Sequence, residues 1–156
     1  MDKIHKLQIF ADYFQLWLED RQTSSTQREF LYTDQHISDR VWVDYGIVVM
    51  FTARNMTVPV ELAILEAEPP IDLDKWDHVT ETSLDIPSGQ VEICGCGGFD
   101  SLMLPLQTGT YRVRMYHRGL ASLSEDGLDG DDHYQIDLWF DSTIKTKVLK
   151  RWTETQ

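Results

Sequence analysis

The stretch HYQIDLWF, residues 133–140, alternates apolar and polar side chains along its length. Side chains of a β-strand point alternately to opposite faces, so this alternation predicts a strand with one buried face. The buried face is expected to carry four apolar residues: Tyr134, Ile136, Leu138 and Phe140. On the opposite face Asp137 is expected to point to solvent. Helical periodicity is scarce here and in most of the chain.

Segments of the same kind recur before this one and are rich in β-branched and aromatic residues. They span residues 4–10, 13–19, 45–53, 58–67, 78–86, 90–96 and 111–117. The polar link RNMT, residues 54–57, and the Pro-Ser-Gly turn at 87–89 each predict a hairpin between the flanking strands. A further hairpin is expected between YRVRMYHRG, residues 111–119, and HYQIDLWF.

One segment, TDQHISDRVW at residues 33–42, indicates a short helix. Thr33 or Asp34 has the side-chain oxygen that caps a helix N-terminus. Ile37 and Val41 stand four residues apart and would share one helical face.

Short strands separated by Pro, Gly and Asp turns are typical of antiparallel all-β folds. The sequence therefore predicts an antiparallel β-sandwich or flattened barrel of about eight strands with one short helix. We expect one β-rich domain over residues 1–156, in which residues 142–156 form a basic C-terminal tail or an edge strand. That segment contains four cationic residues: Lys145, Lys147, Lys150 and Arg151.

The charge of the chain narrows the classes of partner. Its 156 residues include 14 Lys and Arg against 26 Asp and Glu, which gives a formal net charge of −12. Such a field repels nucleic-acid phosphates, because nucleic-acid binding requires clustered cations. Direct binding to DNA or RNA is therefore not expected, whereas a basic protein partner would be attracted.

Membrane and secretion signals are not evident. The chain has no apolar run of about 18 residues, the length that spans a bilayer. Its first ten residues, MDKIHKLQIF, lack the apolar core and cleavage site of a secretory signal. A cytoplasmic location without a membrane span is the expectation.

The most acidic stretch precedes the last alternating strand. Between residues 125 and 132 it contains five carboxylates: Glu125, Asp126, Asp129, Asp131 and Asp132. An EF-hand loop starting at Asp126 would place Leu128 and Gly130 at ligand positions, so that calcium motif does not fit. An irregular cation site, or a solvated turn whose carboxylates meet a basic partner, remain the two interpretations.

Two further groups could carry chemistry. Cys94 and Cys96 would lie on one strand face about 6.5 Å apart, which is unfavourable for a disulfide, and zinc would need two more ligands. His117 and His133 border the acidic stretch and would meet across a hairpin as a general base or ligand pair. Motifs for a serine nucleophile, a dinucleotide and a P-loop are missing from the sequence, so no cofactor is predicted.

The order of these segments resembles the competence protein J family, the β-rich bacterial inhibitors of a DNA-entry nuclease. The resemblance runs from about Ile9 to Asp141 and is carried by MFTARN, residues 50–55, LPLQTGTYRVR, residues 104–114, and DDHYQIDLW, residues 131–139. It implies a non-enzymatic protein-binding module, with an extracellular or membrane-associated nuclease as the class of partner. The Cys-Gly-Cys-Gly-Gly segment and the C-terminal tail depart from the family pattern.

The five carboxylates of residues 125–132 are the residues we expect to contact such a partner. As alternatives, the chain is a small metal-dependent hydrolase that uses His117, His133 and the acidic stretch, or a β-sandwich domain with an unassigned ligand.

Overall fold

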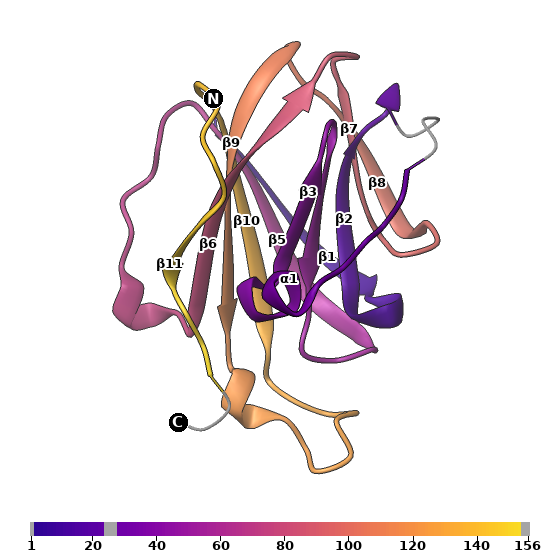
Figure 1. Cartoon of the computed structure of the whole chain (residues 1–156), viewed down its shortest axis with the longest axis vertical. Helices are drawn as coiled ribbons and strands as arrows, with labels where there is room; N and C mark the ends of the chain where they lie inside the picture. The colour runs from indigo at the N-terminus through magenta and orange to yellow at the C-terminus, as the bar shows by residue number, and fades with distance from the viewer. Residues whose placement is uncertain (1, 24–27, 154–156) are drawn as a thin grey trace.

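The computed structural model describes residues 2–23 and 28–153, which form two packed β-sheets (Figure 1). Sheet A contains six strands in the order β1 (Lys3–Phe10), β5 (Thr57–Leu65), β10 (His133–Phe140), β9 (Gly109–Arg118), β6 (His78–Ile86) and β11 (Lys147–Lys150). Sheet B contains five strands in the order β3 (Val41–Asp44), β4 (Ile47–Phe51), β2 (Gln15–Asp20), β7 (Gln90–Gly95) and β8 (Phe99–Pro105). The β-sandwich predicted from the sequence is confirmed, in its flattened form rather than as a closed barrel.

The hairpin between β9 and β10 is confirmed, whereas two other predicted hairpins are wrong. Strands β9 and β10 pair antiparallel along their length. By contrast, β4 belongs to sheet B and β5 to sheet A, so residues 52–56 carry the chain from one sheet to the other. The Pro-Ser-Gly turn at 87–89 likewise connects β6 of sheet A to β7 of sheet B. Turn residues reverse the chain in both situations, so they do not distinguish a hairpin from a crossing between sheets.

The burial of side chains on the two faces of strand β10 differs from the prediction at two positions, Phe140 and Asp137. Tyr134, Ile136 and Leu138 do point into the core between the sheets. Phe140, however, lies at the end of the sheet and is 54% exposed, with its ring edge-to-face against Tyr111. Asp137 is 3% exposed, so the predicted solvent-facing position of this carboxylate is wrong.

The predicted helix is present but shorter. Helix α1 spans Asp34–Asp39, and the Thr33 side chain accepts a hydrogen bond from the backbone N–H of His36, which confirms the N-cap. Arg40 follows in a left-handed conformation with φ of 63°, which ends the helix. Val41, expected on the helix, instead begins β3, and Ile37 is exposed.

Strands β3 and β8 were not predicted, whereas β11 lies in the segment expected as a basic tail or an edge strand. The basic segment near the C-terminus contributes β11, which pairs antiparallel with β6 at the edge of sheet A.

No helix within residues 2–23 and 28–153 is long and apolar enough to cross a membrane.

Several connections meet at one end of the sandwich, drawn at the bottom of Figure 1. They are helix α1, the link between β4 and β5, the turn between β1 and β2, and the long connection between β9 and β10. This end also carries the acidic stretch of residues 125–132.

Candidate functional site

The connection between β9 and β10, residues 119–132, is named here the acidic loop. It begins at Gly119, whose φ is 73° and where a Cβ atom would lie 2.4 Å from the carbonyl oxygen of Asp131. That close approach and the left-handed backbone require glycine. The loop therefore closes on itself at its base, and its tip extends away from the sheets (Figure 1).

Serine hydroxyls shape the tip of the acidic loop. The Ser124 hydroxyl donates to Oδ1 of Asp126 at 2.6 Å and accepts the Asp129 backbone N–H at 2.9 Å. Ser122 accepts the Asp131 backbone N–H at 2.7 Å. The hydrogen bond from Ser124, followed by that from the Leu128 backbone N–H, lowers the pKa of Asp126. The carboxylate of Asp126 thus stays ionised while it supports the turn.

Four of the five predicted carboxylates are exposed on this loop: Glu125, Asp126, Asp129 and Asp131. Three of them, Glu125, Asp129 and Asp131, form no side-chain hydrogen bond or ion pair with another residue that the structure describes. Their negative charges are therefore available to a partner. Their role in binding stays a prediction.

Asp132 belongs to a different environment, so its assignment to the exposed patch is corrected. It is 1% exposed, and its Oδ1 atom accepts a charge-assisted hydrogen bond from Nε of Arg54 at 2.6 Å. The Tyr134 hydroxyl donates to its other oxygen at 2.5 Å, and Arg54 also donates to the carbonyl of Leu128 at 3.0 Å. Asp132 and Arg54 thus fasten the acidic loop to the link between β4 and β5.

Two exposed aromatic residues flank the other side of that link. Tyr13 is 70% exposed and Phe14 is 47% exposed, and both have positive φ, 54° and 62°. The Tyr13 backbone N–H donates to Oδ1 of Asn55 at 3.0 Å, and the Phe14 carbonyl accepts the Thr52 N–H at 2.9 Å. Consecutive non-glycine residues in this region cost about 1–3 kcal/mol each, which the surrounding contacts must offset.

The aromatic turn borders a hollow of about 280 Å³. Its lining includes Tyr13, Phe14, Tyr32, Ile37 and Phe51, of which Ile37 on helix α1 is 52% exposed. We name Tyr13, Phe14 and Ile37 the apolar rim. The link at residues 52–55 lies between the apolar rim and the acidic loop, because Arg54 contacts the loop and its neighbour Asn55 contacts Tyr13.

Sequence reasoning missed this rim. Tyr13 and Phe14 were assigned to a strand, but η1 (Asp12–Phe14) interrupts the chain before β2 begins at Gln15. Side-chain alternation continues across the turn, so the pattern contains no signal that these two residues leave the sheet. An unusual φ at a non-glycine residue cannot be read from residue types.

The predicted histidine pair does not form. His117 and His133 lie diagonally on paired strands, since Tyr134 is opposite His117 and His133 is opposite Arg118, and they point to opposite faces. His117 is fully buried and its Nε2 lies 2.8 Å from the carbonyl oxygen of Phe51. Burial lowers its pKa well below the ordinary value. A histidine enclosed in this way cannot reach a substrate, so this route to a hydrolase is not supported.

His117 instead packs against a second buried histidine, His78, with ring centroids 5.3 Å apart. Nε2 of His78 lies 2.8 Å from the carbonyl oxygen of Asp39, and Nδ1 accepts the Trp152 backbone N–H at 3.1 Å. These contacts fix a neutral ring. The pKa of His78 is lowered to about 4, chiefly by burial.

The two cysteines are free thiols. Cys94 is buried, and burial raises its pKa to about 12, so the nucleophilic thiolate is strongly disfavoured. In the part of the chain that the structure describes, no three His, Cys, Asp or Glu side chains come together as a metal site.

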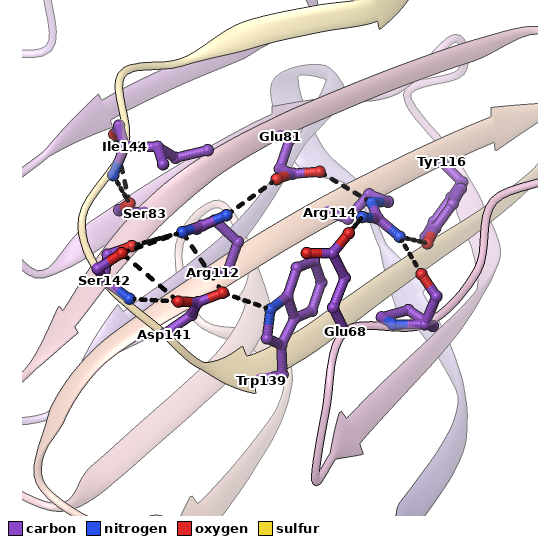
Figure 2. A network of polar contacts seen from close by, with 11 residues as sticks. Glu68, Glu81, Ser83, Arg112, Arg114, Tyr116, Trp139, Asp141, Ser142 and Ile144 are labelled. Atoms are coloured by element: carbon purple, nitrogen blue, oxygen red, sulfur yellow. Dashed lines mark hydrogen bonds and ion pairs between the residues drawn. The ribbon is translucent and has the colours of Figure 1, made fainter.

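The outer face of sheet A carries a second set of charged residues, shown in Figure 2. Arg114 on β9 donates to Glu81 on β6 at 2.9 Å and to the carbonyl of Pro69 at 2.9 Å, and it pairs with Glu68 at 3.2 Å. Its guanidinium lies 4.8 Å from the ring centroid of Trp139. We call these residues, together with Arg112 and Asp141, the arginine network.

The arginine network explains why Asp137 is buried. Residues 66–77 and 141–146 cover the outer face of sheet A, and Glu68 and Asp141 connect these segments to arginines of β9. Asp137 accepts hydrogen bonds from the Tyr116 hydroxyl at 2.7 Å and from Gln135 at 3.0 Å. Burial raises the pKa of this carboxyl group.

The two-sheet arrangement is shared with solved structures of low sequence identity. The crystal structure of ComJ, inhibitor of the DNA-degrading activity of NucA from Bacillus subtilis, has a TM-score of 0.66 and 18% identity, over 89% of this chain and 96% of that chain. A structure described as crocagin biosynthetic gene J has a TM-score of 0.60 and 15% identity, over 91% of this chain and 99% of that chain. The predicted resemblance to the competence protein J family is thus confirmed at the level of fold.

No protein-family model matches the sequence, and no curated protein matches it. The likeness therefore concerns architecture, and the site must be argued from its own residues.

Proposed function

We propose that this protein is a non-enzymatic binding module that inhibits a nuclease by docking one end of its sandwich against the enzyme's basic surface. The observation that carries the proposal is the position of the acidic loop and the apolar rim on either side of residues 52–55. The ComJ likeness supports the nuclease as the class of partner, since ComJ is an inhibitor of a DNA-degrading enzyme.

The two surfaces would contribute in different ways. Exposed carboxylates attract a surface that is built to bind DNA phosphates, and this attraction acts mainly on the rate of encounter. Exposed aromatic side chains that enter a pocket of the partner hold the complex together and slow its dissociation. The acidic loop would thus speed association with the partner, and the apolar rim would slow dissociation from it. The net charge of −12 adds long-range attraction to a basic enzyme.

The partner-binding residues in this proposal are Glu125, Asp126, Asp129 and Asp131 on the acidic loop, with Phe14 as the anchor. Asp132 acts within the protein, because it is buried against Arg54. Direct binding to nucleic acid is not part of the proposal, since the acidic loop presents carboxylates rather than cations.

The test uses NucA and a fluorescent DNA substrate, with association rates measured by surface plasmon resonance at several salt concentrations. The loop double variant Glu125→Gln/Asp129→Asn is compared with the matched control Glu29→Gln/Asp74→Asn, which removes the same two charge types from exposed positions elsewhere. The loop variant should associate several-fold more slowly with a shallower salt dependence, and the control should resemble wild type.

Phe14→Ala provides the second arm. It should raise the dissociation rate by about tenfold or more while leaving association nearly unchanged, because truncating a central aromatic anchor costs about 1.4 kcal/mol or more. Equal association rates for the two double variants would overturn the role of the acidic loop. DNA degradation that continues at saturating wild-type protein would overturn inhibition of this nuclease.

A further inference from the structure

A second hollow lies on the outer face of sheet A, away from the apolar rim. Its volume is about 450 Å³, which falls within the range of small-molecule sites. The residues that line it include Lys6, Lys75, Trp76, Arg118, His133 and Gln135. None of the functional expectations above assigns a role to this hollow.

The sheet register brings the lining residues together. Lys6 on β1 pairs opposite Glu61 on β5, and Gln135 on β10 lies beside Glu61 on the other side. Arg118 at the end of β9 is opposite His133 at the start of β10. The hollow therefore crosses four neighbouring strands of sheet A, at the level where β9 ends and β10 begins.

Trp76 supplies the remaining wall and positions two of the cations. It is 5% exposed, and its ring lies 4.8 Å from that of Tyr116 and 6.5 Å from that of His133. The Lys75 ammonium is 5.3 Å from the centroid of the indole, and the Arg118 guanidinium is 5.4 Å from it. Cation–π contacts of this kind hold charged groups at an aromatic surface without neutralising them.

The cations at the hollow are not paired with carboxylates. Lys6, Lys75 and Arg118 form no ion pair with any residue in the described ranges 2–23 and 28–153, although Arg114 and Arg54 do form such pairs. Glu61 is the acidic residue that lines the hollow. Three unpaired cations around one concavity are unexpected in a protein of net charge −12.

The environment of His133 agrees with a locally positive potential. Its pKa is lowered, first by burial and then by Arg118, with a further contribution from Lys75, and Glu61 acts in the opposite direction. Arg118 thus lowers the pKa of His133 more than Glu61 raises it.

We propose that the hollow is a binding site for a small phosphate-bearing molecule. A planar guanidinium that donates two hydrogen bonds, together with ammonium groups, is the donor set that recognises phosphate oxygens. Gln135 adds a neutral donor, and the pyrrolidine ring of Pro59 and the indole of Trp76 give the hollow apolar surface for the rest of the ligand. This site goes beyond the proposed inhibition of a nuclease, because it opens on the outer face of sheet A, beside the base of the acidic loop, which Arg118 and His133 flank.

The test is a titration of the full-length protein with inorganic pyrophosphate at low ionic strength, followed by ¹H–¹⁵N NMR. The indole N–H of Trp76 and the backbone amides of Arg118 and His133 should shift in a saturable way. Citrate, titrated in parallel, distinguishes phosphate recognition from general attraction of anions.

The variants are two charge-matched pairs. Lys75→Gln/Arg118→Gln should weaken pyrophosphate binding at least tenfold, whereas Lys145→Gln/Lys147→Gln, which removes two exposed cations of the C-terminal segment, should leave it unchanged. The backbone spectrum and melting temperature of each variant verify that it is folded. The proposal is overturned if wild type shows no saturation at millimolar pyrophosphate, if citrate binds equally well, or if both double variants lose affinity alike.

Discussion

The arginine network on sheet A and the acidic loop contain the same kind of carboxylates in opposite environments. Glu81 is 3% exposed, between Arg112 and Arg114 of the neighbouring strand. Glu125 and Asp129 are exposed on the acidic loop. The carboxylates of the arginine network lie beside arginines and hold covering segments of the chain against sheet A. Those of the acidic loop present net negative charge to the solvent. The role of a carboxylate thus follows from the cation beside it rather than from local charge density.

Asp132 shows how narrow the boundary between these environments is. It is adjacent in sequence to exposed Asp131, yet it is paired with Arg54 and is 1% exposed. One residue therefore separates a carboxylate that is free to meet a partner from one that holds the loop in place.

The largest effect is expected from Arg114→Ala. Its removal leaves Glu81 buried without its closest cation and frees the carbonyl of Pro69. Breaking a buried ion pair from one side costs about 3–5 kcal/mol, because the remaining charge is uncompensated. Urea unfolding of wild type and variant measures this loss. The double variant Arg114→Leu/Glu81→Leu should recover part of it, and a loss below about 1 kcal/mol for Arg114→Ala would contradict the structural role of the network.

Asp132→Ala is expected to cost about 3 kcal/mol, since it leaves Arg54 with a buried, uncompensated charge and removes the acceptor of the Tyr134 hydroxyl. The variant should also detach the acidic loop, which increased amide hydrogen exchange at residues 120–131 would detect. Asp131→Ala is the matched control, because the neighbouring residue is exposed. Equal stability of the two variants would remove the distinction between Asp132 and the exposed carboxylates.

Much of the fold could be predicted from the sequence, because its signals are local. Alternation along residues 133–140 reflects the two faces of one strand, and the cap at Thr33 depends on a contact three residues away. Pairing of β9 with β10 follows from their proximity along the chain. These features need no knowledge of distant segments.

The features that could not be predicted all depend on distant contacts. Asp137 appears exposed by alternation, but chain segments from before β6 and after β10 cover its face of the sheet. Arg54 and Asp132 are 78 positions apart, so residue types cannot show that they meet. The exposed loop was recognised from its acidic composition, whereas the apolar rim depends on a backbone turn that alternation conceals.

Acidification should lower the free energy of unfolding, because the buried histidines His78 and His117 are uncharged in the folded protein. The folded-state pKa of His78, about 4, lies below its ordinary value of 6.5, so the unfolded chain binds the proton more readily. The contribution of His78 to the free energy of unfolding is fully present above pH 6.5. It is lost progressively as the pH decreases toward 4. Between pH 6.5 and 5 the loss is about 2 kcal/mol, and His117 should add a loss of the same sign.

Urea unfolding at a series of pH values measures this slope. The variant His78→Asn removes one titrating group, so its stability should depend less steeply on pH by about one proton. That comparison isolates the histidine from Asp137, whose raised pKa acts in the opposite direction. An unchanged slope in His78→Asn would show that the ring is already accessible to protons in the folded protein.

The smallest effect on stability is expected from the acidic loop itself. Glu125→Gln/Asp129→Asn/Asp131→Asn should change the free energy of unfolding by no more than about 0.5 kcal/mol, because these side chains are exposed and the turn depends on other groups. Loss of mutual repulsion favours a slight gain. Ser124→Ala is the control within the same loop, and it should cost about 1 kcal/mol, since Ser124 bonds both Asp126 and the Asp129 backbone. Should the triple variant lose as much stability as Asp132→Ala in urea, the exposed carboxylates would be structural, and partner binding would have to involve another surface.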